Sequence, residues 1–386
     1  MIVEKPTVSW VGMGAVGSNK RSAPLVAIVS TLRDAAPVLR SFITYHQAIG
    51  FERFFLFFDD PSDSSIAIAK SFPSVTVIPN DEELHARWRT SARFPDAARV
   101  LTAEPMARQL LNVDMAIQMA LESGIDWLLH IDVDELFYIP AGDAPDHFQE
   151  LTRRGIRRVE YRNHEAVPET AVIYDYFREV TLFKNNYVAT AYRYENRRAE
   201  LAAQVAQLPP KFFHFYSNGK SAAQVRPGLV APGAHGFRQR EERQWPLTAV
   251  HELLRSRWYR ALGKTRPGLY RVVKTSAYKM VRARDSRSPA ILHYACCGFG
   301  HFWAKYRTLG AFGDQRWAQG DIRSTIGAFH VDARDVVATG DKPAVLRFYE
   351  ERMVIDDEAL TERLIAEGVL LRIRGPAELL AKADAT

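Results

Sequence analysis

The sequence predicts an α/β fold, in which a mostly parallel, wound β-sheet is flanked by helices and followed by a largely helical C-terminal part. Short continuous apolar runs alternate with amphipathic segments of helical period, which is typical of parallel β–α–β units. Several of these runs end in acidic residues, as strands at the ligand-binding edge of such a sheet do. The 386 residues are 47% hydrophobic and 25% charged, ordinary values for a globular protein with a sizeable core.

The N-terminal half alternates between predicted strands and predicted helices. The strands are continuous apolar runs, as expected for strands buried on both faces, and the helices repeat apolar residues at helical spacing. Asp34 is a suitable N-cap for the first helix, and Gly50 and Gly124 are suitable ends for two helices. The predicted elements are strand 25–32, helix 34–50, strand 53–58, helix 64–72, strand 75–78, loop 80–101, helix 104–123, strand 127–131, helix 145–154 and strand 156–161.

The fourth predicted strand, residues 127–131, ends abruptly in Asp132, Asp134 and Glu135. Ligands of open α/β sheets bind at the carboxyl ends of the strands. Two carboxylates two residues apart at that edge can hold a divalent cation, and the cation can hold a diphosphate. A solvated turn is the alternative, but three acids against a buried strand repel one another unless a positive charge lies between them.

Composition limits the compartment and the partners. The formal charge of +6 favours acidic partners without requiring nucleic acid. The two cysteines, Cys296 and Cys297, are adjacent, so they form no disulfide framework and fit a reducing compartment. There is no apolar run long enough for a membrane span, and the N-terminal segment lacks the charge order of a secretory signal. We therefore expect a protein of the cytoplasm or of the cytoplasmic membrane face.

Four regions are predicted. Residues 1–24 form a flexible leader, since their G-x-G-x-x-G is followed by a proline-containing turn rather than by a helical pattern. Residues 25–237 form the catalytic core, and residues 289–386 complete the site. Residues 238–288 form a basic insertion: residues 238–287 hold 14 Lys and Arg against 4 Asp and Glu, interleaved with aromatics. The insertion is predicted to hold an anionic glycan or a membrane surface; a solvated helical insertion is the alternative.

Several short motifs follow one another in a characteristic order. They are R-D at 33–34, Y-H-x-x-x-G at 45–50, F-F-L-F-F-D-D-x-S-D at 54–63, R-Q at 108–109 with Asn112 on the same helix, D-W-L-L-H-I-D-V-D-E-L at 126–136, F-K-x-N at 183–186, N-G-K-S-A-A-Q-V-R-P at 218–227, I-L-H-Y at 291–294, Lys305 and F-H-V-D-A-R-D at 329–335. This order resembles the nucleotide-sugar glycosyltransferases of the GT-A fold, in particular the family 92 and family-2-like group. The likeness covers roughly residues 25–375, and H-I-D-V-D-E is its most specific part.

The resemblance implies a metal-dependent glycosyltransferase that moves a sugar, with galactose as one candidate, from a UDP-sugar to a glycan or another hydroxyl acceptor. In such enzymes the D-x-D pair holds Mn²⁺ or Mg²⁺, which neutralises the diphosphate. The implied metal ligands are Asp132, Asp134 and His293. The implied donor contacts are Thr31, Arg33, Asp59, Asp60, Asp132, Lys220 and Arg226. Lys220 and Arg226 lie in a glycine- and proline-rich stretch that is expected to form a loop, from which they would reach phosphate oxygens; solvated surface charges are the alternative.

Direct displacement at the sugar carbon, the inverting course found in family 92, requires a general base for the acceptor hydroxyl. Glu165 is our candidate, with Glu169 and Asp314 as rivals, because Glu165 follows the strand after the acidic one. The chain lacks the F-G pair that many family members carry near this point, which leaves the acceptor open.

Two other functions fit part of the pattern. A strand-end D-x-D is also found in phosphohydrolases of the haloacid dehalogenase type, although these usually carry it on their first strand. The third possibility is a non-catalytic basic module that binds glycans or membranes, against which the intact Asp132 and Asp134 argue.

Overall fold

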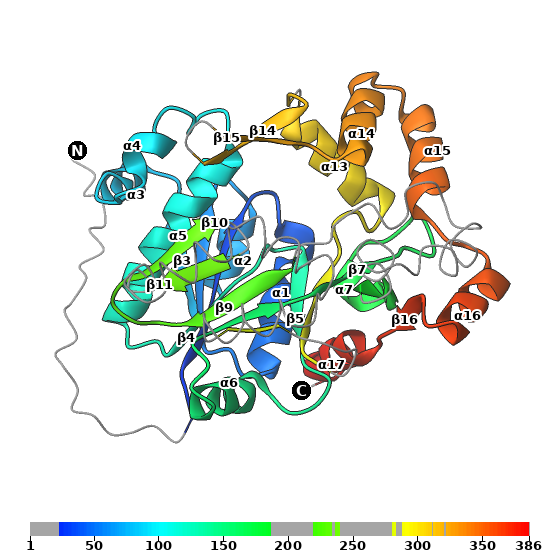
Figure 1. The fold of residues 1–386 in the computed structure, drawn as a ribbon. Helices are drawn as coiled ribbons and strands as arrows, with labels where there is room; N and C mark the ends of the chain where they lie inside the picture. The colour runs from blue at the N-terminus through cyan, green and yellow to red at the C-terminus, as the bar shows by residue number, and fades with distance from the viewer. Residues whose placement is uncertain are drawn as a thin grey trace, which may run out of the picture.

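The computed structural model describes residues 23–186, 219–233, 236–239, 280–282, 288–310, 312–319 and 322–385. In these ranges the larger sheet consists of β1 (Val26–Leu32), β2 (Arg53–Phe58), β3 (Val75–Pro79), β4 (Trp127–His130), β6 (Arg158–Tyr161), β9 (Lys220–Gln224) and β12 (Met280–Arg282). The strand order is β12-β6-β9-β4-β1-β2-β3, and every strand except β9 runs parallel to the others (Figure 1). The predicted α/β class, with a mostly parallel sheet flanked by helices, is confirmed.

Helices cover both faces of this sheet. In β1, Val26 and Ile28 belong to one hydrophobic cluster, and the alternating Ala27 and Val29 belong to another. The first cluster includes side chains of α1 and α6, and the second includes side chains of α3 and α5. The helices of this half are α1 (Ala36–Ala48), α2 (Ser65–Lys70), α3 (Glu82–Trp88), α4 (Phe94–Ala97), α5 (Pro105–Glu122) and α6 (Ala144–Arg153). The continuous apolar runs are therefore strands buried on both faces.

A second sheet, which the sequence analysis did not predict, adjoins the acidic stretch. Its strands are β5 (Glu135–Tyr138), β7 (Asn163–Ala166), β8 (Leu182–Lys184), β13 (Ala290–His293) and β16 (Leu370–Arg372). Their order is β16-β8-β7-β13-β5, with β13 antiparallel to β5 and parallel to β7. Because β5 begins at Glu135, the acidic turn passes directly from the first sheet into the second.

The C-terminal part is largely helical, as predicted. It contains α13 (Phe299–Leu309), α14 (Ala328–Ala338), α15 (Lys342–Met353), α16 (Glu358–Ala366) and α17 (Gly375–Asp384), preceded in the chain by the short α7 (Tyr176–Glu179). Helices α13, α14 and α15 share a hydrophobic cluster, and α17 packs on α1 and α7. In Figure 1, α15 and α16 lie on the opposite side of the molecule from α3 and α4. In the ranges that the structure describes, no helix has the length and apolar character that a membrane crossing requires.

Two local predictions are wrong. Residues 80–101, predicted as a loop, contain α3 and α4, and α3 begins where the Asp81 carboxylate accepts a hydrogen bond from Leu84 N at 3.0 Å. Asp34 does not cap α1: Ala35 holds that position, Asp34 has a positive φ of 55°, and its N–H donates to Asp63. The capping Asp81 is the local signal for the start of α3. Only Leu84 and Trp88 of that helix are buried, so the helix has no apolar period that the sequence could reveal.

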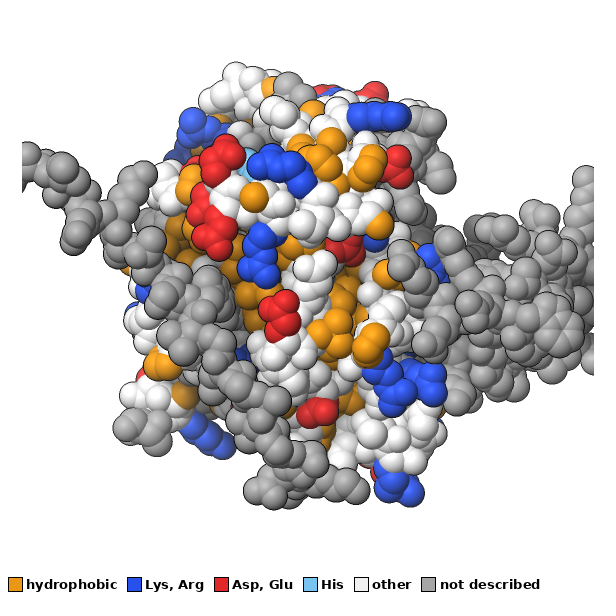
Figure 2. All heavy atoms as spheres, turned by 90° about the vertical axis from the view of Figure 1, so that its left-hand side faces the viewer, with side chains coloured by type: hydrophobic (Ala, Val, Ile, Leu, Met, Phe, Trp, Pro, Cys, Tyr) orange, Lys and Arg blue, Asp and Glu red, His pale blue; other side chains and the backbone are white. Residues whose placement is uncertain are grey.

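The predicted leader and basic insertion fall mainly outside the described residues. Of residues 238–288, only the end of β11 (Gly236–Gln239), the strand β12 and Ser288 are described. β11 pairs with β10 (Leu229–Gly233), and a separate two-stranded sheet joins β14 (Gln315–Gln319) to β15 (Ile322–Thr325). On the face that carries α3 and α4, the visible acidic and basic side chains are interspersed rather than gathered by sign (Figure 2).

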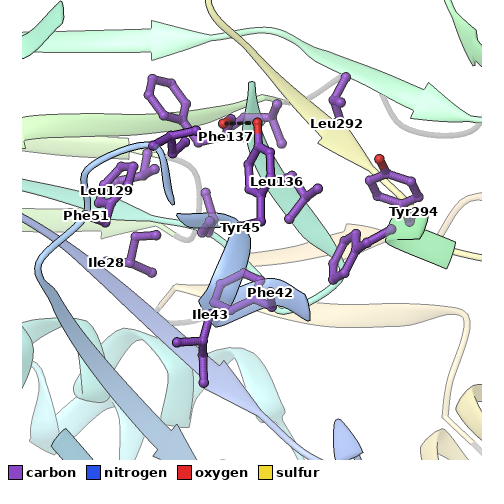
Figure 3. Close-up of a cluster of buried hydrophobic side chains, with 14 of the residues drawn as sticks. Ile28, Phe42, Ile43, Tyr45, Phe51, Leu129, Leu136, Phe137, Leu292 and Tyr294 are labelled. Atoms are coloured by element: carbon purple, nitrogen blue, oxygen red, sulfur yellow. Dashed lines mark hydrogen bonds between the residues drawn. The ribbon is translucent and has the colours of Figure 1, made fainter. Parts of the chain in front are cut away.

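The Y-H motif at the end of α1 holds the backbone of β5. The Tyr45 hydroxyl donates to Phe137 O at 3.1 Å, a bond drawn in Figure 3, and Phe137 N donates to His46 Nε2 at 3.1 Å. His46 Nδ1 in turn donates to Phe42 O at 2.8 Å, which fixes the neutral Nδ1–H tautomer. Both polar groups of one backbone unit, two residues after Glu135, are therefore bound by neighbouring side chains of α1.

His46 predicts an acid-sensitive fold. Burial lowers the pKa of His46 from 6.5 to about 3. Between these two pH values His46 is protonated in the unfolded chain and neutral in the folded chain. The contribution of neutral His46 to the unfolding free energy is therefore complete above pH 6.5 and is lost as the pH falls. Between pH 6.5 and 4.5 we expect wild type to lose about 2 kcal/mol more unfolding free energy in urea titrations than His46→Gln. Parallel pH curves for the two proteins would contradict this role of His46.

Candidate functional site

The acidic turn is closed by its own side chains and backbone. Glu135 N donates to Asp132 O at 3.1 Å, and Asp132 N donates to Glu135 Oε2 at 2.8 Å. Tyr294 N donates to Asp134 O at 2.8 Å and ties the turn to the end of β13. Glu135, which is 2% exposed, is therefore a structural member of the turn, while Asp132 and Asp134 remain partly exposed.

Lys220 balances the charge of the turn from the start of β9. Its Nζ lies 2.5 Å from Asp132 Oδ2 and 3.5 Å from Glu135 Oε2, and its side chain is 2% exposed. Burial opposes the charge on Lys220, but Asp132 and Glu135 outweigh it and raise the Lys220 pKa. Burial, with the acidic neighbours, raises the pKa of Glu135 to about 8 against the effect of Lys220. The other oxygen of Asp132 accepts a bond from Gln109 Nε2 at 2.7 Å.

Asp134 lies between a lysine and a histidine of one segment. Lys305 Nζ on α13 is 3.1 Å from Asp134 Oδ2 and 3.0 Å from Ala295 O, and His293 Nε2 is 3.9 Å from Asp134 Oδ1. Burial favours the protonated form of Asp134, but Lys305 outweighs it and holds the pKa below its ordinary value. Burial lowers the pKa of His293 to about 4, so its ring is neutral near pH 7.

A row of polar residues crosses four neighbouring strands of the second sheet. His293 is paired with Glu135 on one side and with Glu165 on the other, and Glu165 is paired with Lys184. Residues paired in this way point to the same face of a sheet. All four are buried, and Lys184 Nζ lies 3.3 Å from Glu165 Oε2. A continuous polar row therefore leads from the acidic turn to Glu165.

A cavity of about 440 Å³ lies at the carboxyl ends of the strands β1 to β3, of which β1 is the neighbour of β4 in the sheet. It is lined by Arg33, Asp59, Asn80, His85, Trp88, Arg89, Phe94, Leu101, Thr102 and Arg108. Arg108 binds both oxygens of Asp59, at 2.5 and 2.6 Å, and the next residue of α5, Gln109, binds Asp132. Consecutive residues of one helix thus connect the cavity to the turn. His85 stacks on Trp88 with ring centroids 4.9 Å apart.

Not every predicted donor contact meets at this edge. Arg33 and Asp59 line the cavity, Arg33 lies 3.5 Å from Asp60, and Thr31 accepts a bond from Asn112 on α5. Lys220 reaches the turn from a strand and contacts carboxylates, whereas the glycine and proline around it predicted a loop beside phosphate.

Arg226 follows the far end of β9, where Val225 N donates to Asp126 O before β4 begins. The structure therefore separates Arg226 from the other predicted contacts by the length of a strand.

The candidate bases are also separated. Glu165 lies within β7 and belongs to the polar row, whereas Glu169 is paired with Arg372 and Asp314 with Arg334, both away from the row. No role was predicted from the sequence for Gln109, Lys184 or Lys305. All three residues occur in the motif order that carries the resemblance, and their place in that order was the available signal.

The described residues do not assemble the predicted metal site in full. Asp134 and His293 face each other, but Asp132 is engaged by Lys220 and Gln109. Among the residues that the structure describes, no group of three or more His, Cys, Asp or Glu is arranged to hold a metal ion. Mg²⁺ at nucleotide sites is usually bound through one or two carboxylates together with waters and substrate phosphates, so Asp134 and His293 would supply only the protein part of such a set.

The pairing of Lys220 predicts a large loss of stability when it is removed. Lys220→Met leaves Glu135 and Asp132 without their buried cation, which costs about 3 kcal/mol of unfolding free energy in urea titrations. Adding Glu135→Gln to this variant removes one of the two acids that lost their partner and restores part of the loss. A Lys220→Met protein as stable as wild type would show that the ion pairs contribute nothing.

No protein-family model matches the chain. Among solved structures, glucosyl-3-phosphoglycerate synthase from Mycobacterium tuberculosis with Mn²⁺, UDP and phosphoglyceric acid is 11% identical, covers 79% of this chain and 87% of its own, and has a TM-score of 0.31. Mouse xyloside xylosyltransferase 1 is 14% identical, covers 71% and 98%, and has a TM-score of 0.28. Core-mannan synthase A from Aspergillus fumigatus, in its Mn/GDP form, is 10% identical; the match covers 61% of this chain and 65% of the synthase, with a TM-score of 0.25.

Two curated relatives are glycosyltransferase-like proteins of Arabidopsis thaliana. One is 26% identical over 374 residues, which are 92% of this chain and 72% of the relative. The other is 24% identical over 371 residues, which are 92% of this chain and 63% of the relative. The chain thus spans about two thirds of the length of these relatives. Their names agree with the enzyme class that the sequence predicts, glycosyltransferase, while family 92 membership remains a prediction.

Proposed function

We propose that the chain is a glycosyltransferase that takes its sugar from a nucleoside-diphosphate donor. The observation that carries this proposal is the connection of the D-x-D turn to the cavity through Arg108 and Gln109. Crevices at the carboxyl ends of parallel strands are the usual nucleotide sites of open α/β sheets. The two Arabidopsis relatives support the reaction class.

In this proposal the three parts of the donor follow one another along the edge. The nucleoside occupies the cavity, where the stacked His85 and Trp88 and the guanidinium of Arg33 are available to it. The diphosphate lies toward the acidic turn, and the sugar lies toward the polar row of the second sheet. UDP is the donor nucleotide implied by the sequence resemblance, with galactose as the first sugar to test and a glycan as the acceptor class.

The reaction is written as a single displacement. The acceptor oxygen forms a bond to the anomeric carbon while the bond from that carbon to the diphosphate oxygen breaks, and its electron pair leaves with UDP. The acceptor proton passes to a carboxylate, for which Glu165 is our candidate because it stands in the polar row beside Lys184. This course inverts the anomeric centre. Of the three metal ligands that the resemblance implies, only Asp134 and His293 face each other, and Asp132 is bound by Lys220 and Gln109. No step of the reaction is therefore assigned to Mn²⁺ or Mg²⁺.

Nucleotide binding is the first test of this proposal. At 100 times its dissociation constant, UDP or GDP is expected to raise the unfolding free energy by about 2.7 kcal/mol, measured as a rise in melting temperature. Arg33→Met removes a cation from the cavity and weakens binding about tenfold, while Arg53→Met, at the opposite end of β2, serves as the matched control. Hydrolysis of simple phosphoesters without nucleotide binding would instead favour a phosphohydrolase, and no response to any nucleotide would favour a binding module.

Glu165 is tested by separating binding from transfer. Mass spectrometry of products from a panel of UDP-sugars and hydroxyl acceptors first identifies a working pair. Glu165→Gln then lowers the transfer rate at least 100-fold, since a missing general base costs that much, and leaves the UDP dissociation constant unchanged. Glu169→Gln, which alters a surface pair with Arg372, is the matched control. A Glu165→Gln enzyme with the wild-type rate would exclude Glu165 as the base.

A further inference from the structure

Both carboxylates of the D-x-D pair are matched by lysines from distant parts of the chain. Lys220 lies 88 residues from Asp132, and Lys305 lies 171 residues from Asp134. The two lysines differ in burial: the side chain of Lys220 is 2% exposed, and that of Lys305 is 31% exposed. This difference assigns them different roles.

Lys220 is fixed in place. It begins β9, which is hydrogen-bonded to β4 on one side and to β6 on the other. The preceding Gly219 lies so close to Tyr161 that a Cβ there would stand 1.6 Å from Tyr161 O. With the strand held on both sides and its ammonium buried, Lys220 keeps its charge beside Asp132 whether or not a ligand is present.

Lys305 is also held in place by its surroundings, but part of its side chain is exposed and can meet a ligand. Its helix, α13, starts after Gly298, whose N–H donates to the Tyr349 hydroxyl at 2.7 Å, and Phe299 N donates to Ala171 O at 2.8 Å. From this anchored helix the ammonium reaches Asp134, and about one third of the side chain remains exposed. An ammonium is a compact charge with three N–H donors, which suits phosphate oxygens.

A divalent cation at the same place would meet like charges. It would approach Asp132 beside the buried ammonium of Lys220, and Asp134 beside the partly exposed ammonium of Lys305. A diphosphate also faces carboxylates here, but Asp132, Asp134 and the cavity residue Asp59 are each already paired with a cation. It meets the partly exposed ammonium of Lys305, and further cations, Arg33 and Arg89, lie in the cavity. The electrostatics of the described residues thus favour an anion over a dication next to Lys305.

We infer that Lys305 contacts the donor diphosphate directly and supplies the positive charge that a divalent metal ion supplies elsewhere, so that the nucleotide binds without a metal. This inference rests on the proposed function, because it concerns the diphosphate of the same donor. Lys220 holds Asp132 and Glu135 in place, and Lys305 binds the ligand.

Isothermal titration calorimetry with UDP, and with GDP as the second probe, tests the inference on the full chain. Titrations are run in EDTA and in Mn²⁺. For wild type we expect dissociation constants within about threefold of each other under the two conditions. Lys305→Met weakens binding in EDTA at least tenfold, Lys305→Arg keeps most of the affinity, and Lys382→Met, on the exposed face of α17, matches wild type. Circular dichroism melting establishes that each variant is folded.

Manganese rescue gives a second readout. Lys305→Met leaves Asp134 facing His293 without the ammonium, so Mn²⁺ can take its place and recover part of the lost UDP affinity. Wild-type binding that requires Mn²⁺ would overturn the inference and leave the glycosyltransferase proposal standing, as would unaltered binding by a folded Lys305→Met protein. If neither nucleotide binds in EDTA or in Mn²⁺, the proposed function itself fails.

Discussion

The site depends on the neutralisation of three carboxyl groups at the end of a buried strand. Asp132, Asp134 and Glu135 lie within four residues, and burying such charges without partners costs several kcal/mol for each ion. Lys220 and Lys305 supply the compensation from β9 and α13, elements that are far away in the sequence. Folding must therefore bring the first sheet, the second sheet and the C-terminal helices together before the acidic turn is stable.

The second sheet is held against the first by side chains of α1. Tyr45 and His46 of α1 bind the carbonyl and the N–H of Phe137, which fixes β5 two residues after the turn. β5 then pairs with β13, and this pairing sets His293 beside Glu135. The Y-H motif, which the sequence analysis treated only as a mark of resemblance, thus has a mechanical explanation: it fixes the register in which the polar row is built.

The sequence predicted the first sheet well because its strands obey a simple rule. Strands such as β2, with its R-F-F-L-F-F run, are covered on both faces, so their hydrophobicity is continuous and visible. The second sheet breaks that rule, since β7 reads N-H-E-A and is nevertheless buried. Its polar side chains are compensated by partners such as Lys184, whose pairing with Glu165 no local pattern reveals. Local rules fail most often at functional sites, which is consistent with the polar row belonging to one.

The antiparallel strand β9 explains why one motif places Lys220 at the acidic turn and Arg226 far from it. Lys220 and Arg226 are six residues apart in N-G-K-S-A-A-Q-V-R-P, whose glycine and proline suggest a loop that brings both cations to one place. Because β9 runs against its neighbours, it begins where β4 and β6 end. Its first residue therefore stands at the ligand-binding edge, and the residues after its end stand at the opposite edge. The small side chains Ser221, Ala222 and Ala223 are buried in the middle of this strand between β4 and β6, and the strand places Lys220 beside Asp132.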